Sequence, residues 1–279
     1  MPTVNLATKY SGQLDQLWTH ASYTDNWVNK KYDFDGVATV KVYTVTTVAP
    51  SDYNRSGTGD RFGGNAELQD TIGTYTLTKD KSFKIAIDRG NFEQGERAKK
   101  AGEVMKAEMN ERIVPMIDAD RLATIAAGAI AVSQAHNFTT DAYRDFLNMS
   151  EDLDEAKAPL DGRVAFVTPA EYNLIKGAIV TKMASGYNDK LVGKGFVGEL
   201  DGVAIVKVPT SYFPTGVKAL MAHRDAVLGV RQITETRIKD DSELISGSLL
   251  LGRFIFGSFI LKGKEKGVSA IVDGSAISS

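Results

Sequence analysis

Alternating hydrophobic and polar residues in the first third of the chain predict a long β-ribbon. The run Val37 to Val48 is rich in Val, Thr and Tyr, which is typical of a strand that uses both faces. At ~3.3 Å per residue this strand would be about 40 Å long. The returning runs Thr71 to Lys79 and Ser82 to Asp88 alternate too. The tip between the outgoing and returning runs has few large apolar residues and carries turn-forming residues, namely Pro50, Gly57, Gly59, Gly63 and Gly64.

The predicted ribbon is longer than a compact domain needs. A two-stranded arm that projects from its own core is marginal in water, so it must bury surface on another copy of the chain or on another protein. We therefore expect a subunit of an assembly. The residues expected at the subunit interface lie at the ribbon tip: Pro50, Tyr53, Arg55, Asp60, Arg61 and Phe62.

The first segment, Met1 to Lys31, carries aromatic residues on a polar background with weak periodicity. Aromatic residues in a terminal arm usually dock onto a surface of the same chain or of a partner. We expect an extended arm with a short helical stretch near Leu14 to His20. The docking residues expected are Tyr10, Trp18 and Trp27.

A long helix is predicted after the ribbon, from Phe92 to Arg112. Steps of three and four residues place one apolar stripe on it, made of Ala98, Ala101, Met105, Met109 and Ile113. At ~1.5 Å per residue the helix would be roughly 30 Å long. Pro115 should end or kink it, and Ile117 to Ala131 continues as a helix with many small residues.

The middle of the chain predicts a mixed α/β region. A third helix spans Thr139 to Ala156, with Ala142, Phe146, Met149 and Leu153 on its apolar face. The strand Val164 to Val167 follows, and Thr168, Pro169 and Glu171 form a helix start in which Thr caps and Glu reaches back. That helix runs to about Ala184, and a glycine-rich loop extends from Ser185 to Gly198.

The last third of the chain predicts strands. They are Val203 to Val208, Lys218 to Ala222, Ala226 to Arg231, Thr234 to Lys239, Arg253 to Lys262 and Gly267 to Val272.

Composition excludes several functional classes. The 279 residues are 43% hydrophobic and 24% charged, which is ordinary for a globular protein, and the formal net charge of -2 gives no overall attraction to nucleic acid or an anionic membrane. The absence of cysteine removes disulfides, thiolate metal sites and cysteine nucleophiles. Neither a signal peptide nor a membrane-spanning run is recognisable, so the sequence predicts a soluble, non-secreted chain.

Gly193, Gly195 and Gly198 spell the glycine pattern of a dinucleotide-binding loop. Such a loop needs a strand before the glycines and a helix after them, because the pyrophosphate binds at the helix N-terminus. Here a loop precedes the glycines and a strand follows. A surface loop is therefore the preferred interpretation, and a nucleotide-binding enzyme is kept as a remote alternative.

Other candidate chemistry is weak. Asp118 and Asp120 are close in sequence, as are Asp33 and Asp35, but capping and solvation explain both pairs better than metal binding does. The acidic group Glu151, Asp152, Asp154 and Glu155 needs no ligand. The histidines, His20, His136 and His223, are isolated, and no serine lies in a triad signature. The sequence therefore predicts no catalytic residue, cofactor or metal site.

Several ordered phrases resemble the major capsid proteins of tailed bacteriophages, which have the Hong Kong 97 type of shell fold. The phrases are Phe83 to Arg89, Arg112 to Arg121, Ala165 to Tyr172, Gly198 to Pro209 and Gly252 to Lys262. The resemblance extends from about Leu14 to Val272 and implies an α+β fold. It divides the chain into an N-terminal arm (1–31), an extended loop (32–91), the spine-helix region of a peripheral domain (92–137), an axial domain (138–230) and closing peripheral strands (231–279).

The resemblance also implies a function. Copies would assemble as pentamers and hexamers into an icosahedral head shell around double-stranded DNA, in a virion built in the bacterial cytoplasm. DNA contact would be non-specific, and portal, scaffold and decoration proteins are further candidate partners. The loop at the capsomer centre would contain Gly186, Gly193, Gly195 and Gly198. An encapsulin-like compartment is the alternative with the same fold.

Two departures limit what the resemblance implies. The chain begins at the arm, so a scaffold is expected to be a separate protein or absent. The lysine and asparagine pair that crosslinks some relatives is not identifiable, so covalent crosslinking is not expected.

Overall fold

The computed structural model describes residues 22–32, 39–56, 61–63, 69–88, 101–182, 196–239 and 247–274. Within them the chain forms, in order, β1 (Thr39–Thr46), β2 (Gln69–Thr76), β3 (Lys79–Asp88), α2 (Ala101–Glu108), the π-helical segment η1 (Met109–Ile113), α3 (Val114–Ala131), β4 (Ala135–Asn137), α4 (Ala142–Glu155), β5 (Arg163–Val167), α5 (Pro169–Lys182), β6 (Phe196–Leu200), β7 (Val203–Lys207), η2 (Thr210–Tyr212), β8 (Val217–His223), β9 (Val227–Lys239), β10 (Gly247–Ile260), η3 (Glu265–Gly267) and β11 (Val268–Val272).

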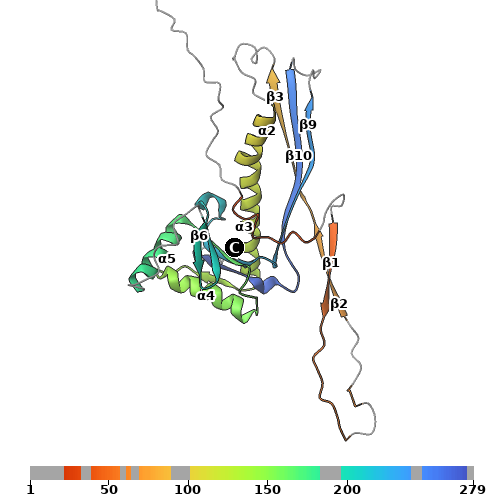
Figure 1. Ribbon diagram of the computed structural model, residues 1–279, viewed down its shortest axis with the longest axis vertical. Coiled ribbons are helices and arrows are strands. Elements are labelled where there is room, and N and C mark those ends of the chain that lie inside the picture. Colours follow the sequence, from red (N-terminus) through yellow and green to blue (C-terminus); the bar gives the residue numbers. More distant parts are fainter. Residues whose placement is uncertain are drawn as a thin grey trace, which may run out of the picture.

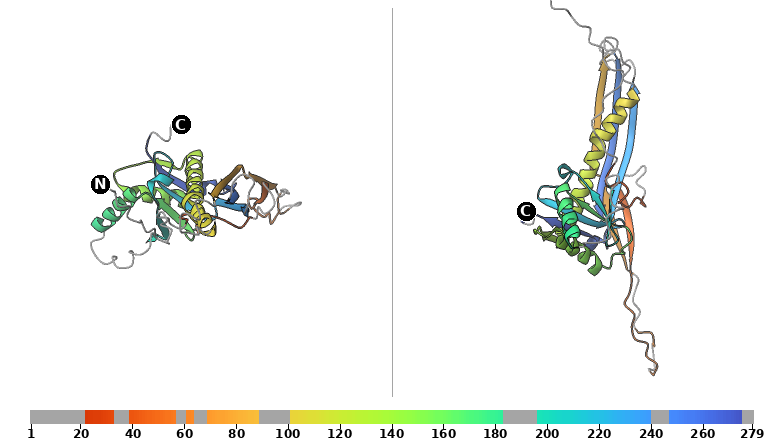
Figure 2. Two further views of the ribbon diagram at one scale, coloured as in Figure 1. Left: turned by 90° about the horizontal axis from the view of Figure 1, so that it is seen from above. Right: turned by 60° about the vertical axis from the view of Figure 1, so that its left-hand side comes forward.

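The molecule is elongated (Figure 1). A rounded part contains α4, α5 and a six-stranded sheet. From it, α2 and α3 extend as one long rod beside the three-stranded sheet β3-β10-β9 (Figures 1 and 2). The hairpin of β1 and β2 projects in the opposite direction.

The six-stranded sheet has the order β4-β11-β8-β5-β7-β6 and carries helices on both faces. Successive residues of β5 alternate between the two faces: Val164 and Phe166 pack in the cluster that contains α3 residues, whereas Ala165 and Val167 pack in the cluster that contains α4 residues. Because both faces are covered, the run Val164 to Val167 within this strand is hydrophobic throughout. The predicted apolar face of α4, formed by Ala142, Phe146, Met149 and Leu153, is buried as expected.

The three-stranded sheet corrects the predicted ribbon. The run Ser82 to Asp88 does not return along β1; it belongs to β3, which pairs with β10 from Lys79↔Phe256 to Asp88↔Gly247. Only β1 and β2 form the ribbon, and at ~3.3 Å per residue their eight-residue strands extend about 26 Å, less than expected. The two strands predicted between Ala226 and Lys239 are one strand, β9, because a register shift opposite Arg253 and Phe254 absorbs the irregularity.

The long helix passes through Pro115 instead of ending there. Proline has no N–H and its ring crowds the carbonyl four residues earlier. The preceding turn is π-helical: the N–H of Val114 donates to the carbonyl oxygen of Met109, the spacing of a π-helix. Ile113 is buried on the sheet with Phe254 and Phe256, and Met109 packs against this cluster, as the predicted stripe requires. The beginning of the predicted helix, 92–100, lies outside the described residues.

Three further expectations need correction. The loop predicted to end at Gly198 contains strand β6, in which Gly198 has a φ of +110° beside a register shift between Phe196 and Glu199. β11 joins the six-stranded sheet instead of β9 and β10, because it pairs with β8 and β4.

The third correction concerns the start of α5. Thr168 caps the helix, since its Oγ1 accepts the N–H of Glu171 at 3.4 Å. The reciprocal bond is absent, because the N–H of Thr168 donates to the carbonyl of Lys218 at 3.2 Å.

Candidate assembly surfaces

The β1–β2 hairpin has one face on the protein core and one face directed outward. Its register pairs Val40 with Tyr75 and Val42 with Gly73. Val42 and Tyr75 are buried in a cluster with Leu228 and Leu261 from the base of the two sheets. Side chains alternate along a strand, so the neighbouring pairs face away from this cluster. The hairpin is therefore held by its base and by one face alone.

Tyr75 fixes the base of the hairpin. Its hydroxyl accepts the backbone N–H of Lys262 at 2.7 Å, and its ring centroid lies 5.5 Å from that of Phe259. Gly73 is required beside it, because a Cβ there would lie 2.7 Å from the Tyr75 hydroxyl oxygen. These contacts set the direction in which the hairpin leaves the body.

The outward face of the hairpin carries one exposed apolar pair among polar residues. Tyr43 and Ile72 lie directly opposite each other in the register and are 64% and 45% exposed. Val48, beyond the end of β1, is also exposed. Opposed aromatic and β-branched residues stabilise a sheet when they are covered, so an uncovered pair indicates a surface that a partner would bury.

The tip has its own internal contacts. The N–H of Asn54 donates to the carbonyl of Arg61 at 3.0 Å, and Ser51 Oγ donates to the carbonyl of Phe62 at 2.8 Å. The rings of Tyr53 and Phe62 meet edge to face with centroids 5.1 Å apart, yet Phe62 is 79% exposed. Of the tip residues expected at a subunit interface, these two lie exposed with Pro50, Arg55 and Arg61, and Asp60 lies outside the described residues.

The end of the N-terminal arm is bound to α3 through Asp118. This buried carboxylate accepts hydrogen bonds from Ser22 Oγ at 2.5 Å, from the N–H of Tyr23 at 2.9 Å and from Thr24 Oγ1 at 2.5 Å. The sequence suggested that Asp118 is solvated or caps a helix. Both interpretations are wrong, because its carboxylate is buried and binds the arm. Its neighbour Asp120 binds Lys79 and Ser258.

Arg121 completes the arm contact. Its guanidinium donates to Thr24 Oγ1 at 3.0 Å and to Asp25 Oδ1 at 3.2 Å. Burial alone would raise the pKa of Asp25, but the hydrogen bond from Lys30 and the charge of Arg121 outweigh it and hold that pKa below its ordinary value. Burial is also the main cause that lowers the pKa of Arg121.

The arm then pairs with the edge of β9. The N–H of Asn29 donates to the carbonyl of Val227 at 2.7 Å, and the N–H of Gly229 donates to the carbonyl of Asn29 at 3.3 Å. A Cβ at Gly229 would lie 2.8 Å from Val28 Cγ2, so only glycine admits this approach. Of the predicted docking residues, Trp27 packs against the core, whereas Tyr10 and Trp18 lie outside the described residues.

Internal hydrogen bonds account for other polar candidates. Asp152 Oδ2 lies 2.7 Å from His136 Nε2 and accepts Ser269 Oγ at 2.6 Å, so it ties α4 to β4 and β11. His136 does not form a triad with Ser269, because both contact the same carboxylate oxygen.

Among the described residues, no three His, Asp or Glu side chains gather as a metal site requires. In this part of the chain no helix has both the length and the apolarity to cross a membrane.

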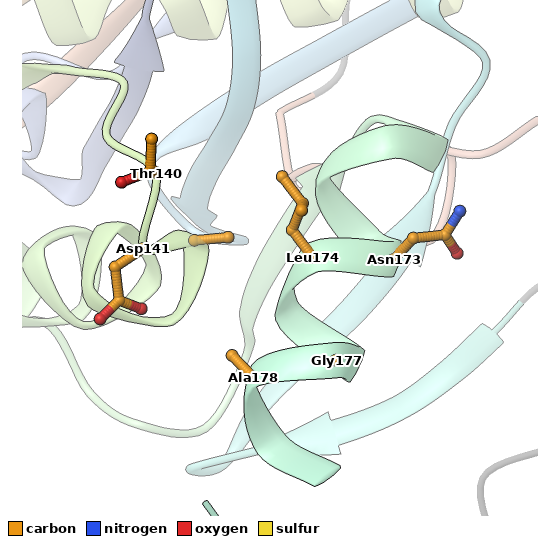
Figure 3. A pocket seen from close by; sticks show the side chains of 7 residues that line it. Thr140, Asp141, Asn173, Leu174, Gly177 and Ala178 are labelled. Carbon is orange, nitrogen blue, oxygen red and sulfur yellow. The ribbon is translucent and has the colours of Figure 1, made fainter. Parts of the chain in front are cut away.

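A shallow groove of about 410 Å³ lies between the start of α4 and the middle of α5 (Figure 3). It is lined by Thr140, Asp141, Ala142, Asn173, Leu174, Gly177 and Ala178. The one acidic side chain in this lining, Asp141, caps α4 by accepting the N–H of Arg144 at 3.2 Å. This lining offers no base and nucleophile pair and therefore does not indicate catalysis.

No protein-family model and no curated protein sequence matches the chain. Solved structures do match it over nearly its whole length. The capsid structure of the cyanophage P-SCSP1u matches with 14% identity and a TM-score of 0.74, covering 97% of this chain and 93% of that chain. The mature capsid of bacteriophage PhiM1 matches with 12% identity and a TM-score of 0.69, covering 96% and 92%.

The capsid of Ralstonia phage GP4 matches in the same way, with 11% identity, a TM-score of 0.66, and coverage of 96% of this chain and 95% of that chain. The chain therefore has the α+β fold found in these phage capsids, and the fold expected from the sequence resemblance is confirmed.

Proposed function

We propose that this chain is the major capsid protein of a tailed phage and that its copies form the icosahedral head shell around the genome. The observation that carries the proposal is the set of exposed apolar side chains on the β1–β2 hairpin and its tip. Tyr43 and Ile72 on the strands, and Tyr53 and Phe62 at the tip, are exposed on an element that projects away from the body. A neighbouring copy would cover these side chains.

The fold of the whole chain supports this proposal. It matches structures of phage capsids at both ends and in the middle, since the matches cover 96% to 97% of the chain. A shell of pentamers and hexamers needs repeated contacts between identical copies, and an elongated subunit with a projecting hairpin can reach its neighbours. The arm and hairpin would hold such a shell without covalent crosslinks.

Charge is consistent with a container for DNA. The formal net charge of -2 gives the wall no strong overall attraction to a polyanion. Contact with packaged double-stranded DNA would be local and non-specific. The protein would reside in the virion capsid after assembly in the bacterial cytoplasm, with portal, scaffold or decoration proteins as further partners.

We infer a structural, non-enzymatic role. For a dinucleotide site, the glycines up to Gly198 would have to lead into a helix N-terminus. Gly198 instead lies within β6, and the turn at Asp201 and Gly202 leads into β7. A strand and not a helix follows the glycine pattern, which argues against the nucleotide-binding alternative.

Electron microscopy of the expressed full chain tests the proposal. The unaltered protein should form closed particles of megadalton mass. The double variant Tyr43→Ser/Ile72→Ser should give a folded subunit that forms no closed particles. Leu160→Ser, which also removes an exposed apolar side chain but outside the hairpin, should assemble normally. A small oligomer from the unaltered protein would overturn the proposal, and normal particles from the double variant would show that Tyr43 and Ile72 are not at the interface between copies.

Particle contents distinguish the alternative with the same fold. Particles that fill with DNA in infected cells are expected for a phage head. Particles that enclose a cargo enzyme would identify an encapsulin-like compartment.

A further inference from the structure

A carboxyl group at the start of α5 is buried without full hydrogen bonding. Glu171 is 3% exposed, and within the described part of the chain its Oε1 has no hydrogen-bond partner. Its backbone is fixed, because its N–H donates to Thr168 Oγ1. An ionised carboxylate held in this way loses its hydration without gaining equivalent bonds.

A second buried carboxylate, Asp145 on α4, lies near enough to Glu171 for its charge to raise the pKa of the Glu171 carboxyl group. Asp145 is 1% exposed and accepts hydrogen bonds from the N–H and the Oγ1 of Thr139, both at 2.8 Å. These two bonds hold the Asp145 carboxylate in place. A negative charge on Glu171 would therefore meet a fixed negative charge across the contact between the two helices.

One cation partly compensates this pair. Lys218 of β8 favours ionisation of Glu171, but its ammonium group also lies 3.7 Å from Asp273 and 5.9 Å from the ring centroid of Phe138. Its side chain is also substantially exposed, so water screens its charge. Burial and then repulsion from Asp145 outweigh Lys218 and raise the pKa of Glu171 from 4.5 to about 7.

We propose that Glu171 is a protonation-controlled element of the contact between α4 and α5. In the packed arrangement its carboxyl group is neutral and fits beside Asp145. When it loses its proton, the two carboxylates repel and the first turn of α5 separates from α4. The device lies in the folded subunit, so it does not depend on the proposed role in a shell.

The direction of the effect follows from the two protonation states. Between pH 4.5 and 7 the folded chain keeps a proton on Glu171 that the unfolded chain releases. Its contribution to stability is therefore complete below pH 4.5 and is lost as the pH rises through about 7. The difference between 4.5 and about 7 sets an upper limit of about 300-fold on the change in the folding equilibrium constant.

Urea denaturation of the full chain between pH 5 and 8.5 tests the proposal. The folding equilibrium constant of the unaltered protein should fall with rising pH more steeply than that of Glu171→Gln. Glu151→Gln, an exposed change on α4, should follow the unaltered protein. Other titrating groups act equally in all three proteins, so the difference isolates Glu171. Parallel curves for the unaltered protein and Glu171→Gln would overturn the proposal.

Hydrogen–deuterium exchange supplies a test without a substitution. After correction for the intrinsic pH dependence of exchange, amides of the first turn of α5 should lose protection between pH 6 and pH 8. Amides in the middle of α4 should change less. Equal protection of α5 at both pH values would contradict the proposal even if Glu171→Gln failed to fold.

Discussion

Asp118 and Arg121 lie one turn apart on α3, with 3.9 Å between Oδ1 of the carboxylate and Nη1 of the guanidinium, and both bind the same stretch of the arm. Thr24 connects them, since its hydroxyl donates to Asp118 and accepts from Arg121. One turn of α3 thus forms hydrogen bonds with residues of the arm that lie almost a hundred positions earlier in the sequence. The contact is buried, so each member depends on the others.

Asp118→Ala should destabilise the unassembled subunit by about 2–4 kcal/mol. The substitution leaves the hydroxyls of Ser22 and Thr24 without their acceptor and Arg121 without a neighbouring charge. Urea denaturation measures the loss, and limited proteolysis should show earlier cleavage within residues 22–32. Asp120→Ala, which removes a less buried carboxylate, serves as the control and should cost less. Equal losses of unfolding free energy in the two variants would mean that the contact between Asp118 and the arm is not especially stabilising.

Gly229→Ala should destabilise the subunit by about 1–3 kcal/mol. The added Cβ would lie 2.8 Å from Val28 Cγ2 and 2.9 Å from Arg121 Nε, so the arm must shift from β9. Gly177→Ala is the matched control, because a Cβ there meets no atom within 4 Å and alanine favours a helix. We expect it to stabilise the unassembled subunit by up to about 1 kcal/mol. Thermal melting of both variants checks the opposite signs.

Acid should release the arm. The hydrogen bond from Lys31 is the main cause that holds the pKa of Asp225 below 3.8, and the pKa of Asp25 is lowered as well. The stability contributed by these carboxylates is present above pH 3.8 and is lost as the pH falls through their lower folded values. Protease cleavage within residues 22–32 should therefore increase below about pH 4. In Asp25→Asn this acid dependence should be weaker, and an unchanged dependence would contradict the assignment.

Ile117 and Met116 are neighbours with opposite environments on α3. Ile117 is 2% exposed beside Phe254 and Phe256, whereas Met116 is 43% exposed. Ile117→Asp should abolish the soluble subunit, and the milder Ile117→Ala should cost about 2–5 kcal/mol. Met116→Asp should change the free energy of unfolding by less than about 0.5 kcal/mol. Similar soluble yields for Ile117→Asp and Met116→Asp would reverse the assignment of the buried face.

Deleting residues 50–64 should leave a folded subunit that forms no closed particles. The described residues in this range contribute none of the buried core, which the hairpin reaches through strand residues such as Val42 and Tyr75. Circular dichroism should show an unchanged melting temperature, and electron microscopy should show no shells. Unfolding of the truncated subunit would show that the tip supports its own chain.

Local periodicity explains which parts of the fold were predictable from the sequence. The apolar face of α4 was predicted because Ala142, Phe146, Met149 and Leu153 recur at helical spacing, and the short hydrophobic run of β5 was predicted in the same way. The pairing of β3 was not predictable. Alternation identifies a strand but does not name its partner, and β10 lies far along the chain.

The polar contacts were harder to predict for the same reason. Nothing near Asp118 in the sequence indicates that Ser22 and Thr24 donate to it, because the contact joins distant segments. Glu171 was expected to complete a capping box, a local motif. Instead, the Thr168 N–H donates to the carbonyl of Lys218, so the Glu171 side chain does not accept it. The carboxyl group of Glu171 lies near the charge of Asp145.

The π-helical turn before Pro115 changes the direction in which the side chains of the long helix point. Each residue of an α-helix advances the side-chain direction by about 100°, so the wider turn at Met109–Ile113 offsets the residues before it from those after it. Met109 and Ile113 within the turn and Ile117 after it all pack on the three-stranded sheet, so side chains from both parts of the helix lie on one surface. The direction of the buried stripe along this rod thus depends on the number of residues in the turn. Substitutions that conserve length would preserve this direction, and loss of a single residue would rotate the side chains of α2 by about 100° relative to those of α3.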